Sequence, residues 1–596
     1  MKWYMGNFNS PKIIKKTDVQ ELFKDNFKRE APQYANEIIE NDFSYAEIYN
    51  IKYDCNYETF ISEDIIILGD MEIYNIDQLK DKYFKNDNTI KNKDILVELY
   101  NLLGIDFIKE LNGEYSFVIL DKNTKKIYLI TDHLGIKPLF WIINRKSLYF
   151  ATDLFLLKDF FDVRELNKEY FIDYYNFFGQ VSNEKTPYKN VYRLEKGTYV
   201  AIDIKKNIIQ KNKYWDLINL QRPIKLKNKQ EYIDKFLCLM KDSVNNRLLK
   251  TDKNGVLMSG GIDSTSIYAV AKSVSNKNIL PVSAVFDVLS DCDERYYIEQ
   301  VLDKYNQKGK YVIADEYGTL NGYPEEYFYT YEPYVNFLTF KLTSELVKGA
   351  SSENVLNLVD GYAGDHLLNG SAVNVIDKIK KLKLIYSFKY IKNIATLENN
   401  SFIFTLYKYV IKMINKSKYF ADIDLKLYLI SKKNINKINT YNQKQLYLQL
   451  CNVAGTRYSD REINPRYNMS SKHPFLDKEL IEYIYNIPGE FRLNSAQGKY
   501  ILRKAINGLL PDEIVSRVTK TQHVSLTFKE LCKNWSMIYN IAKNFEIGNL
   551  GIIDLTKDEW KDQLNKFRCG QTVQENFFVI LSLELWLNDY KRYLIK

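Results

Sequence analysis

The sequence predicts two domains of different fold class: an N-terminal α+β sandwich and a C-terminal α/β domain with a large helical part. Up to about residue 210, short apolar runs are separated by turns, which is typical of a β-rich domain. After residue 231, apolar strands, turns and helices follow one another in the pattern of a parallel sheet. Beyond residue 371, the spacing of apolar residues is almost entirely helical.

The N-terminal pattern mixes strands and helices, so we expect a layered sandwich. Strands are predicted at 65–70, 115–120, 127–130 and 198–202. Residues 93–100 have helical periodicity instead. The polar stretch 216–230, which contains Arg222 and Pro223, is predicted to be a linker between domains 1–215 and 231–596.

The C-terminal pattern begins with an amphipathic helix at 232–249. Strands are predicted at 255–258, 281–288, 310–313 and 355–359. Helices are expected to begin at Asp263 and Asp293, between these strands. A parallel sheet built in this way places its ligands at the carboxyl edge of the strands.

The composition is that of a globular protein with a locally basic segment. Of 596 residues, 45% are hydrophobic and 27% are charged, which excludes wholesale disorder and fibrous folds. The formal charge is +9, and residues 371–420 alone carry ten lysines against Asp377 and Glu398. We interpret the basic helical segment 371–450 as a solvated helical face, because apolar residues recur among its lysines. A surface for an acidic peptide, a nucleic acid or a membrane is the alternative.

The chain carries no sign of secretion, membrane insertion or a disulfide framework. Its first eight residues lack the apolar core of a signal peptide, and no stretch approaches the ~18 apolar residues of a membrane helix. Six cysteines (55, 238, 292, 451, 532 and 569) are scattered without a CxxC pair. We therefore expect a cytoplasmic protein with reduced thiols, no membrane span and no nucleic acid partner.

The strongest motif is a Ser-Gly-Gly-x-Asp-Ser loop at 259–264, between an apolar strand and a helix. Gly260 and Gly261 let backbone amides approach an anion, while Ser259 and Ser264 add hydroxyl donors. The Lys-Ser/Thr pair of a Walker A loop is missing, which favours chemistry at the α-phosphate of ATP with pyrophosphate leaving. A structural Gly-Gly turn with a helix cap is the alternative. The residues assigned to the nucleotide are Leu257, Ser259, Gly260, Gly261, Asp263, Ser264, Phe286, Gly361 and Lys499.

A second acidic motif, Asp-Gly-Tyr-Ala-Gly-Asp-His, follows the apolar run at 355–359 and occupies 360–366. Asp263 and Asp365 would then both lie at the carboxyl edge of the parallel sheet. Two carboxylates there suit Mg²⁺, which prefers few protein carboxylates together with phosphate oxygens. We expect ATP and Mg²⁺ as ligands, with Asp263 and Asp365 on the metal.

Ordered motifs along nearly the whole chain resemble the class B asparagine synthetase superfamily. In the C-terminal half they are 259–264, 292–295, 361–365, 473–477 and 498–505, followed by Leu510, Pro511 and Arg517. In the N-terminal half they are 72–75, 111–116, 132–140 and 214–216. The resemblance implies an N-terminal Ntn-like αββα glutaminase domain and a C-terminal domain similar to ATP pyrophosphatases.

Two departures from that family bear on function. Its glutaminases carry a cysteine at position 2, whereas this chain has Lys2, and the internal Cys55 lacks the adjacent α-amine that activates the thiol. The first domain is therefore expected to be a catalytically inactive scaffold. The second departure is Tyr362, where glutamine-dependent asparagine synthetases have glutamate and β-lactam synthetases have tyrosine.

The resemblance to β-lactam synthetases implies catalytic roles for Tyr362, Glu398 and Lys520. Tyrosine ordinarily has a pKa of about 10, so Tyr362 needs a polarising neighbour to deprotonate an amine, and Glu398 is a conceivable partner. Lys520 stands where the family has a lysine that stabilises the tetrahedral intermediate, although one extra residue separates it from Arg517. Lys499 is expected to bind pyrophosphate.

Among relatives without the N-terminal cysteine, the chain is most similar to lasso-peptide macrolactam synthetases. That resemblance implies adenylation of an Asp or Glu side chain in a precursor peptide, followed by attack of the peptide's N-terminal amine. A leader peptidase and a leader-recognition protein would then be partners. The alternatives are a β-lactam synthetase-like enzyme, an ammonia-dependent asparagine synthetase-like enzyme, and a nucleotide-binding protein without catalysis.

Overall fold

The computed structural model shows a two-domain architecture over most of the chain. It describes residues 2–32, 34–40, 42–49, 60–85, 90–91, 94–179, 184–203, 206, 208–334, 337, 339–370, 374–397, 399–407, 435–451, 453, 458–494, 497–519, 521 and 524–594.

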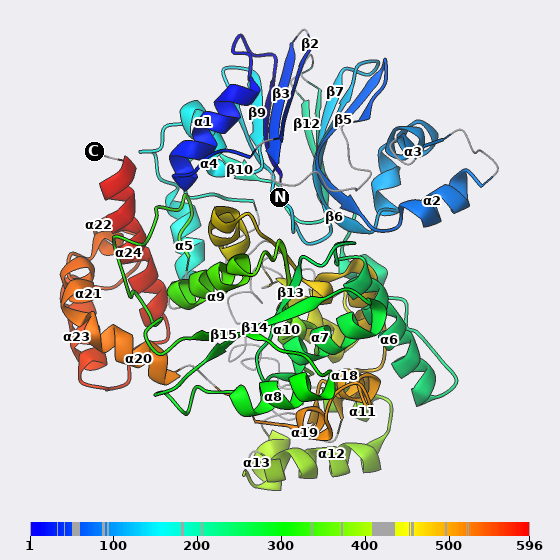
Figure 1. Ribbon diagram of the computed structural model, residues 1–596, viewed down its shortest axis with the longest axis vertical. Helices are drawn as coiled ribbons and strands as arrows, with labels where there is room; N and C mark the ends of the chain where they lie inside the picture. The colour runs from blue at the N-terminus through cyan, green and yellow to red at the C-terminus, as the bar shows by residue number, and fades with distance from the viewer. Residues whose placement is uncertain are drawn as a thin grey trace.

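In the described residues, the N-terminal domain consists of two antiparallel sheets of six strands each (Figure 1). The first sheet has the order β10-β8-β9-β1-β3-β2 and comprises β1 (Lys2–Phe8), β2 (Tyr34–Glu40), β3 (Phe43–Tyr49), β8 (Phe140–Asn144), β9 (Ser147–Ala151) and β10 (Tyr192–Arg193). The second has the order β12-β11-β7-β6-β5-β4 and comprises β4 (Phe60–Ile61), β5 (Ile65–Ile73), β6 (Gly113–Asp121), β7 (Lys126–Thr131), β11 (Thr198–Asp203) and β12 (Ile208–Lys213).

Helices cover the outer face of each sheet, so the domain is an αββα sandwich as predicted. Alternate strand residues such as Tyr45, Leu68 and Val118 fill the layer between the sheets. Helices α1 (Lys16–Phe27) and α4 (Leu154–Leu157) pack on the first sheet, and α2 (Ile76–Tyr83) and α3 (Ile95–Leu103) lie beside the second (Figure 1).

Over the part of the chain that the structure describes, the C-terminal domain is built on a five-stranded parallel sheet of order β15-β14-β13-β16-β17. Its strands are β13 (Asn254–Leu257), β14 (Ile279–Val285), β15 (Lys310–Ile313), β16 (Asn357–Val359) and β17 (Ser470–Lys472). One face packs on α6 (Lys229–Asn245), α7 (Ile262–Val274) and α8 (Arg295–Lys304), and the other on α9 (Phe340–Ser352). The predicted strand, turn and helix order from 255 to 359 is confirmed.

Three short strands lie in the described part of the region predicted to be almost entirely helical. β17 is formed by Ser470, Ser471 and Lys472, which are too few and too polar to give a strand pattern. A short hairpin of β18 (Leu493–Asn494) and β19 (Gln497–Gly498) also interrupts the helices.

The strand order places a topological switch point between β13 and β16. From β13 the chain runs outward through β14 and β15, then returns to β16 on the other side of β13. Loops that leave neighbouring strands toward opposite sides open a crevice at the carboxyl edge of the sheet. Both predicted ligand motifs begin there, because one follows β13 and the other follows β16.

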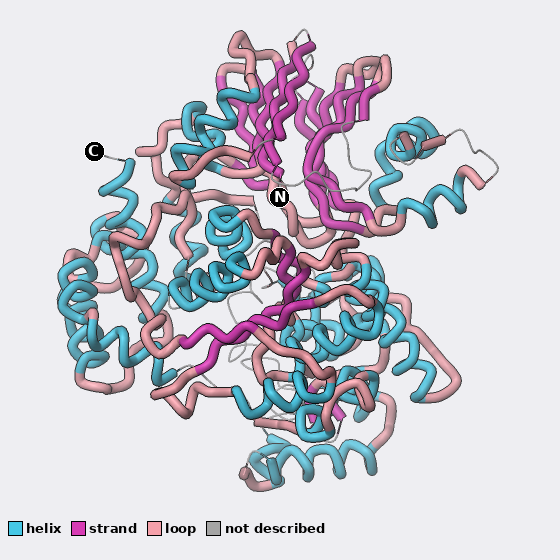
Figure 2. Tube along the Cα trace, viewed as in Figure 1, coloured by secondary structure: helices cyan, strands magenta, loops and turns pink. Residues whose placement is uncertain are grey.

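The last helices join the C-terminal end of the chain to the N-terminal domain. They are α20 (Val524–Lys533), α21 (Trp535–Ala542), α22 (Glu546–Asn549), α23 (Lys557–Arg568) and α24 (Phe577–Leu594). In Figures 1 and 2 the last of these helices, α24, stands beside α5 (Lys168–Asn176). Trp586 packs on Phe171, and the hydroxyls of Tyr174 and Ser582 are 3.3 Å apart. The two domains therefore share one apolar cluster.

The described part of the basic segment is helical, with lysines on its outer side. It comprises α11 (Asn374–Lys380), α12 (Leu384–Leu397), α13 (Phe402–Leu406) and α16 (Tyr441–Cys451). On α12, Lys389 and Lys392 are exposed, whereas Tyr390, Ile391 and Ile394 are buried. Residues 408–434 of this segment lie outside the described residues.

Within the described ranges, no helix is long and apolar enough to cross a membrane. The five described cysteines, 238, 292, 451, 532 and 569, are free, and Cys55 lies outside the described residues.

Candidate functional site

The loop after β13 is held in shape by its own serines. The Ser259 N–H donates to Ser264 Oγ at 3.0 Å, and the two hydroxyl oxygens are 3.0 Å apart. The Ser264 hydroxyl also lies 3.2 Å from the Ser259 carbonyl oxygen. These contacts therefore tie Ser259, the second residue after β13, to the first turn of α7, which begins at Ile262 after Gly261.

The peptide groups of Gly260 are braced from two other segments. Its N–H donates to Glu294 Oε2 at 3.0 Å, and its carbonyl accepts from Arg517 Nη1 at 2.9 Å. Arg517 also donates to Glu294 Oε1 at 2.9 Å and stacks over the ring of Tyr297. A Cβ on Gly260 would lie 2.8 Å from Cβ of Tyr297, so only glycine fits between these braces.

The loop after β16 packs directly against Asp263 through two glycines. A Cβ on Gly361 would lie 2.7 Å from the Ser264 nitrogen, and one on Gly364 would lie 2.7 Å from Asp263 Cγ. Gly364 starts the short helix α10 (Gly364–Leu368), which carries Asp365 in its first turn. The two motifs are thus in contact, as the parallel-strand rule predicts.

Lys499 connects the two carboxylates. Its Nζ lies 2.5 Å from Asp263 Oδ2 and 2.6 Å from Asp365 Oδ1. The two oxygens are therefore at most about 5 Å apart. Oxygens that share a Mg²⁺ ion at about 2.1 Å each lie within ~4.2 Å of one another, so small side-chain rotations suffice for both to reach one metal. The Lys499 ammonium occupies the position that a bound metal ion would take, and the two carboxylates fit such an ion.

Tyr362 lies beside a buried histidine flanked by two aspartates. Its backbone N–H donates to Asp360 Oδ1 at 3.0 Å, and its ring centroid is 5.3 Å from that of His473. His473 Nδ1 lies 2.9 Å from the same Asp360 oxygen, and its Nε2 lies 3.0 Å from Asp460 Oδ2. The turn that carries Tyr362 is therefore fixed by a polar chain from β16 to β17.

The remaining predicted site residues fall into two groups. Leu257 is the last residue of β13, and Phe286 directly follows the neighbouring strand β14. Phe286 is buried against Cys292 and Leu342. Lys520 and Glu398, by contrast, lie outside the described residues, so their predicted roles stay predictions.

At position 2 the side chain forms a buried ion pair. Lys2 Nζ lies 3.0 Å from Glu47 Oε2 on the neighbouring strand β3, and Glu47 also accepts a hydrogen bond from the Tyr45 hydroxyl. Lys2 lines a cavity of about 60 Å³ between the domains, together with Lys137 and His473. An ammonium held in this way is no nucleophile, which supports the expectation of an inactive first domain.

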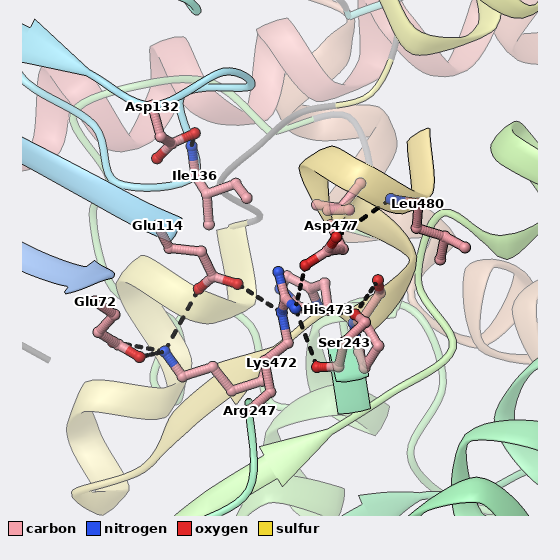
Figure 3. A network of polar contacts seen from close by, with 12 residues as sticks. Glu72, Glu114, Asp132, Ile136, Ser243, Arg247, Lys472, His473, Asp477 and Leu480 are labelled. Atoms are coloured by element: carbon pink, nitrogen blue, oxygen red, sulfur yellow. Dashed lines mark hydrogen bonds and ion pairs between the residues drawn. The ribbon is translucent and has the colours of Figure 1, made fainter. Parts of the chain in front are cut away.

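Buried charges at the domain interface support the strand that precedes His473 (Figure 3). Lys472, the last residue of β17, reaches Glu72 at 2.5 Å and Glu114 at 3.5 Å, both from the N-terminal domain. Arg247 donates from Nε to Glu114 Oε1 at 2.8 Å and from Nη1 to Asp477 Oδ2 at 3.1 Å. Burial by itself raises the pKa of Glu114, but Lys472 and Arg247 outweigh it and hold the pKa below its ordinary value.

We expect an Arg247→Met variant to lose much of the stability of the domain interface. The side chain of Arg247 is 1% exposed, and its removal leaves Glu114 and Asp477 buried with one fewer cation. Breaking a buried ion pair in this way costs about 3–5 kcal/mol. Thermal melting should shift strongly, whereas an Arg164→Met control, which removes an exposed pair with Asp162, should melt like the parent. An unchanged melting temperature for Arg247→Met would contradict this role.

Several site residues carry no assignment from sequence alone. His473, Arg517 and Glu294 all stand in recognisable motifs, yet only their contacts show what they hold. Asp460 stands in none of the motifs, and its partner His473 directly follows β17. A pattern of residues does not reveal contacts of this kind.

Comparisons with known proteins give family-level similarities for both domains. A family model described as asparagine synthase matches residues 235–537, and one described as glutamine amidotransferase domain matches residues 60–215. A Methanocaldococcus jannaschii protein, named among the glutamine-hydrolyzing asparagine synthetases, is 27% identical over 55% of this chain and 64% of its own length.

Two Bacillus subtilis proteins are also similar. The chain is 25% identical to asparagine synthetase (glutamine-hydrolyzing) 2 over 76% of this chain and 62% of that protein. It is 22% identical to asparagine synthetase (glutamine-hydrolyzing) 1 over 99% of this chain and 97% of that protein. The matches therefore span just under two thirds of the archaeal relative and of the first Bacillus relative.

Proposed function

The chain belongs to the asparagine synthase family, and we propose that it is an ATP-dependent ligase that forms an amide through an acyl-adenylate. The observation that carries the proposal is the juxtaposition of the Ser259–Ser264 loop with Asp263, Asp365 and Lys499 at the switch point of the sheet. A glycine-rich loop at a helix N-terminus binds phosphates, and the neighbouring carboxylates and ammonium suit a metal-bound triphosphate.

The first half-reaction activates a carboxylate. A substrate carboxylate oxygen attacks the α-phosphorus of ATP, the bond to the β-phosphate oxygen breaks, and pyrophosphate leaves. Asp263 and Asp365 would hold Mg²⁺, which neutralises charge on the phosphate oxygens. Lys499 would bind the departing pyrophosphate, while Glu294 and Arg517 keep the Gly260 turn in place.

The second half-reaction forms the amide. The amine nitrogen attacks the acyl carbon of the adenylate, a tetrahedral centre forms, and its collapse breaks the bond to the phosphate oxygen and releases AMP. The amine proton must leave during this step, and we assign its transfer to the Tyr362 hydroxyl, which would accept it while passing its own proton to Glu398. Lys520 would stabilise the oxyanion.

We further propose that the amine belongs to the substrate itself, and that the product is a macrolactam of a precursor peptide. Lys2 in an ion pair with Glu47 supports this, because no glutamine-derived ammonia is then supplied by the first domain. The Tyr362 turn supports it as well, since this residue is shared with β-lactam synthetases, which close rings within one substrate. A leader-recognition protein and a leader peptidase are the partners that such a substrate implies.

The proposal is tested with a candidate peptide that carries a free N-terminal amine and an internal Asp or Glu. We expect ATP-dependent release of pyrophosphate and a product lighter by one water. The matched control is the same peptide with an acetylated N-terminus, which should exchange pyrophosphate into ATP without closing a ring. Glutamine should yield no glutamate above a control without enzyme. Asparagine formation from aspartate and ammonia at a comparable rate, or glutamate release, would instead favour an asparagine synthetase.

A further inference from the structure

Lys499 takes the place between the two acidic side chains that a metal ion would need. Its ammonium lies 2.5 Å from Asp263 and 2.6 Å from Asp365, and the residue is 9% exposed. It reaches the carboxylates from the start of α18 (Tyr500–Ala505), directly after the β18–β19 hairpin. One monovalent cation thus bridges the pair of carboxylates that we assign to the divalent ion.

Neighbouring groups restrict both carboxylates more than they restrict Lys499. Asp263 is held against the neighbouring loop, because Gly364 and Gly361 approach its Cγ and backbone so closely that no Cβ would fit. Asp365 is held on its other side, where Asn369 Nδ2 donates to the same Oδ1 atom at 2.9 Å. Lys499 has a long side chain with several rotatable bonds, so it is the member of this group that can move.

We propose that Lys499 makes metal binding conditional on the nucleotide. The ammonium and a divalent ion repel one another at these distances, so they compete for the same two carboxylates. A triphosphate brings enough negative charge to pair with both cations, and the Lys499 ammonium can then turn from the carboxylates to the phosphate oxygens. The metal therefore enters together with the nucleotide. This inference rests on the proposed function only in taking a metal and a triphosphate as the ligands of the site.

The test measures Mn²⁺ binding by electron paramagnetic resonance of the free ion, without any substrate. In the absence of nucleotide, Lys499→Met should bind Mn²⁺ at least ~10-fold more tightly than the parent, because the competing charge is gone. Addition of α,β-methylene ATP should tighten Mn²⁺ binding strongly in the parent and much less in the variant. Mn²⁺ should likewise tighten nucleotide binding less in Lys499→Met than in the parent, since binding linkage is reciprocal.

Three further variants make the result specific. Lys504→Met removes an exposed lysine from the same helix and should leave Mn²⁺ binding as in the parent. Lys499→Arg keeps a cation and should bind Mn²⁺ as weakly as the parent, which also covers the case in which Lys499→Met folds poorly. Asp365→Asn combined with Lys499→Met should abolish the gain, because it removes one of the two metal ligands.

The outcomes separate this inference from the proposed function. If Lys499→Met binds Mn²⁺ no more tightly than the parent, or if Lys499→Arg binds as tightly as Lys499→Met, the competition is wrong. Mn²⁺ binding needs no amide product, so a protein that gains metal affinity yet forms no amide would contradict the proposed function alone. A protein that forms amides without the metal effect would contradict this inference alone.

Discussion

Asp365→Asn is expected to lower substrate-dependent exchange of pyrophosphate into ATP by at least ~100-fold, the scale of losing one group that stabilises the developing charge. The substitution removes a negative charge and nearly preserves the shape of the side chain. Asp365 and Asp263 share one cation centre, so the same loss is expected for Asp263→Asn. The fold should persist, because Asp365 is carried by a helix whose Leu367 and Leu368 remain buried.

The control for this prediction is Asp303→Asn, which makes the same chemical change at an exposed position of α8. It should exchange pyrophosphate like the parent. Exchange should be measured over a range of Mg²⁺ concentrations, since high metal can partly compensate a weakened site. Full activity of Asp365→Asn at limiting Mg²⁺ would show that the two aspartates do not share a metal.

Four of the five strands of the C-terminal sheet could be predicted from sequence because they lie in apolar runs, at 255–258, 281–288, 310–313 and 355–359. β14 is buried between helices on the two faces of the sheet, so its pattern is nearly continuous in apolar residues. β17 fails that rule, because a strand of three residues at the edge of the sheet needs no apolar run. Its pairing with β16 depends on the tertiary fold and not on the local sequence pattern.

The candidate site, too, could be predicted from sequence only in part. Asp263 and Asp365 could be placed together from sequence, because residues after parallel strands meet at one edge of the sheet. Lys499 follows Asp263 by more than two hundred residues and reaches it only through the hairpin before α18. The burial of Glu114, Lys472 and Arg247 could not be predicted either, since charged residues are ordinarily expected at the surface.

Tyr362→Phe should separate the two half-reactions of the proposed enzyme. The substitution removes only the hydroxyl, so the turn held by the Tyr362 N–H on Asp360 should remain. Adenylation depends on the phosphate loop and on Asp263 and Asp365, whereas amide formation also needs a group that takes the proton from the amine. We expect amide formation to fall by at least ~100-fold, the usual scale for losing a general base, while pyrophosphate exchange is largely retained.

Tyr311→Phe is the matched control, because it removes a tyrosine hydroxyl from the edge strand β15 of the same sheet. Both half-reactions should proceed in that variant as in the parent. The structure gives Tyr362 a polar surrounding in His473 and Asp360, and a pure loss in the second half-reaction would show that its hydroxyl acts on the amine. Ring closure at the parent rate by Tyr362→Phe would place the base elsewhere, on the substrate or on Glu398, and the likeness to β-lactam synthetases would then fail at its central residue.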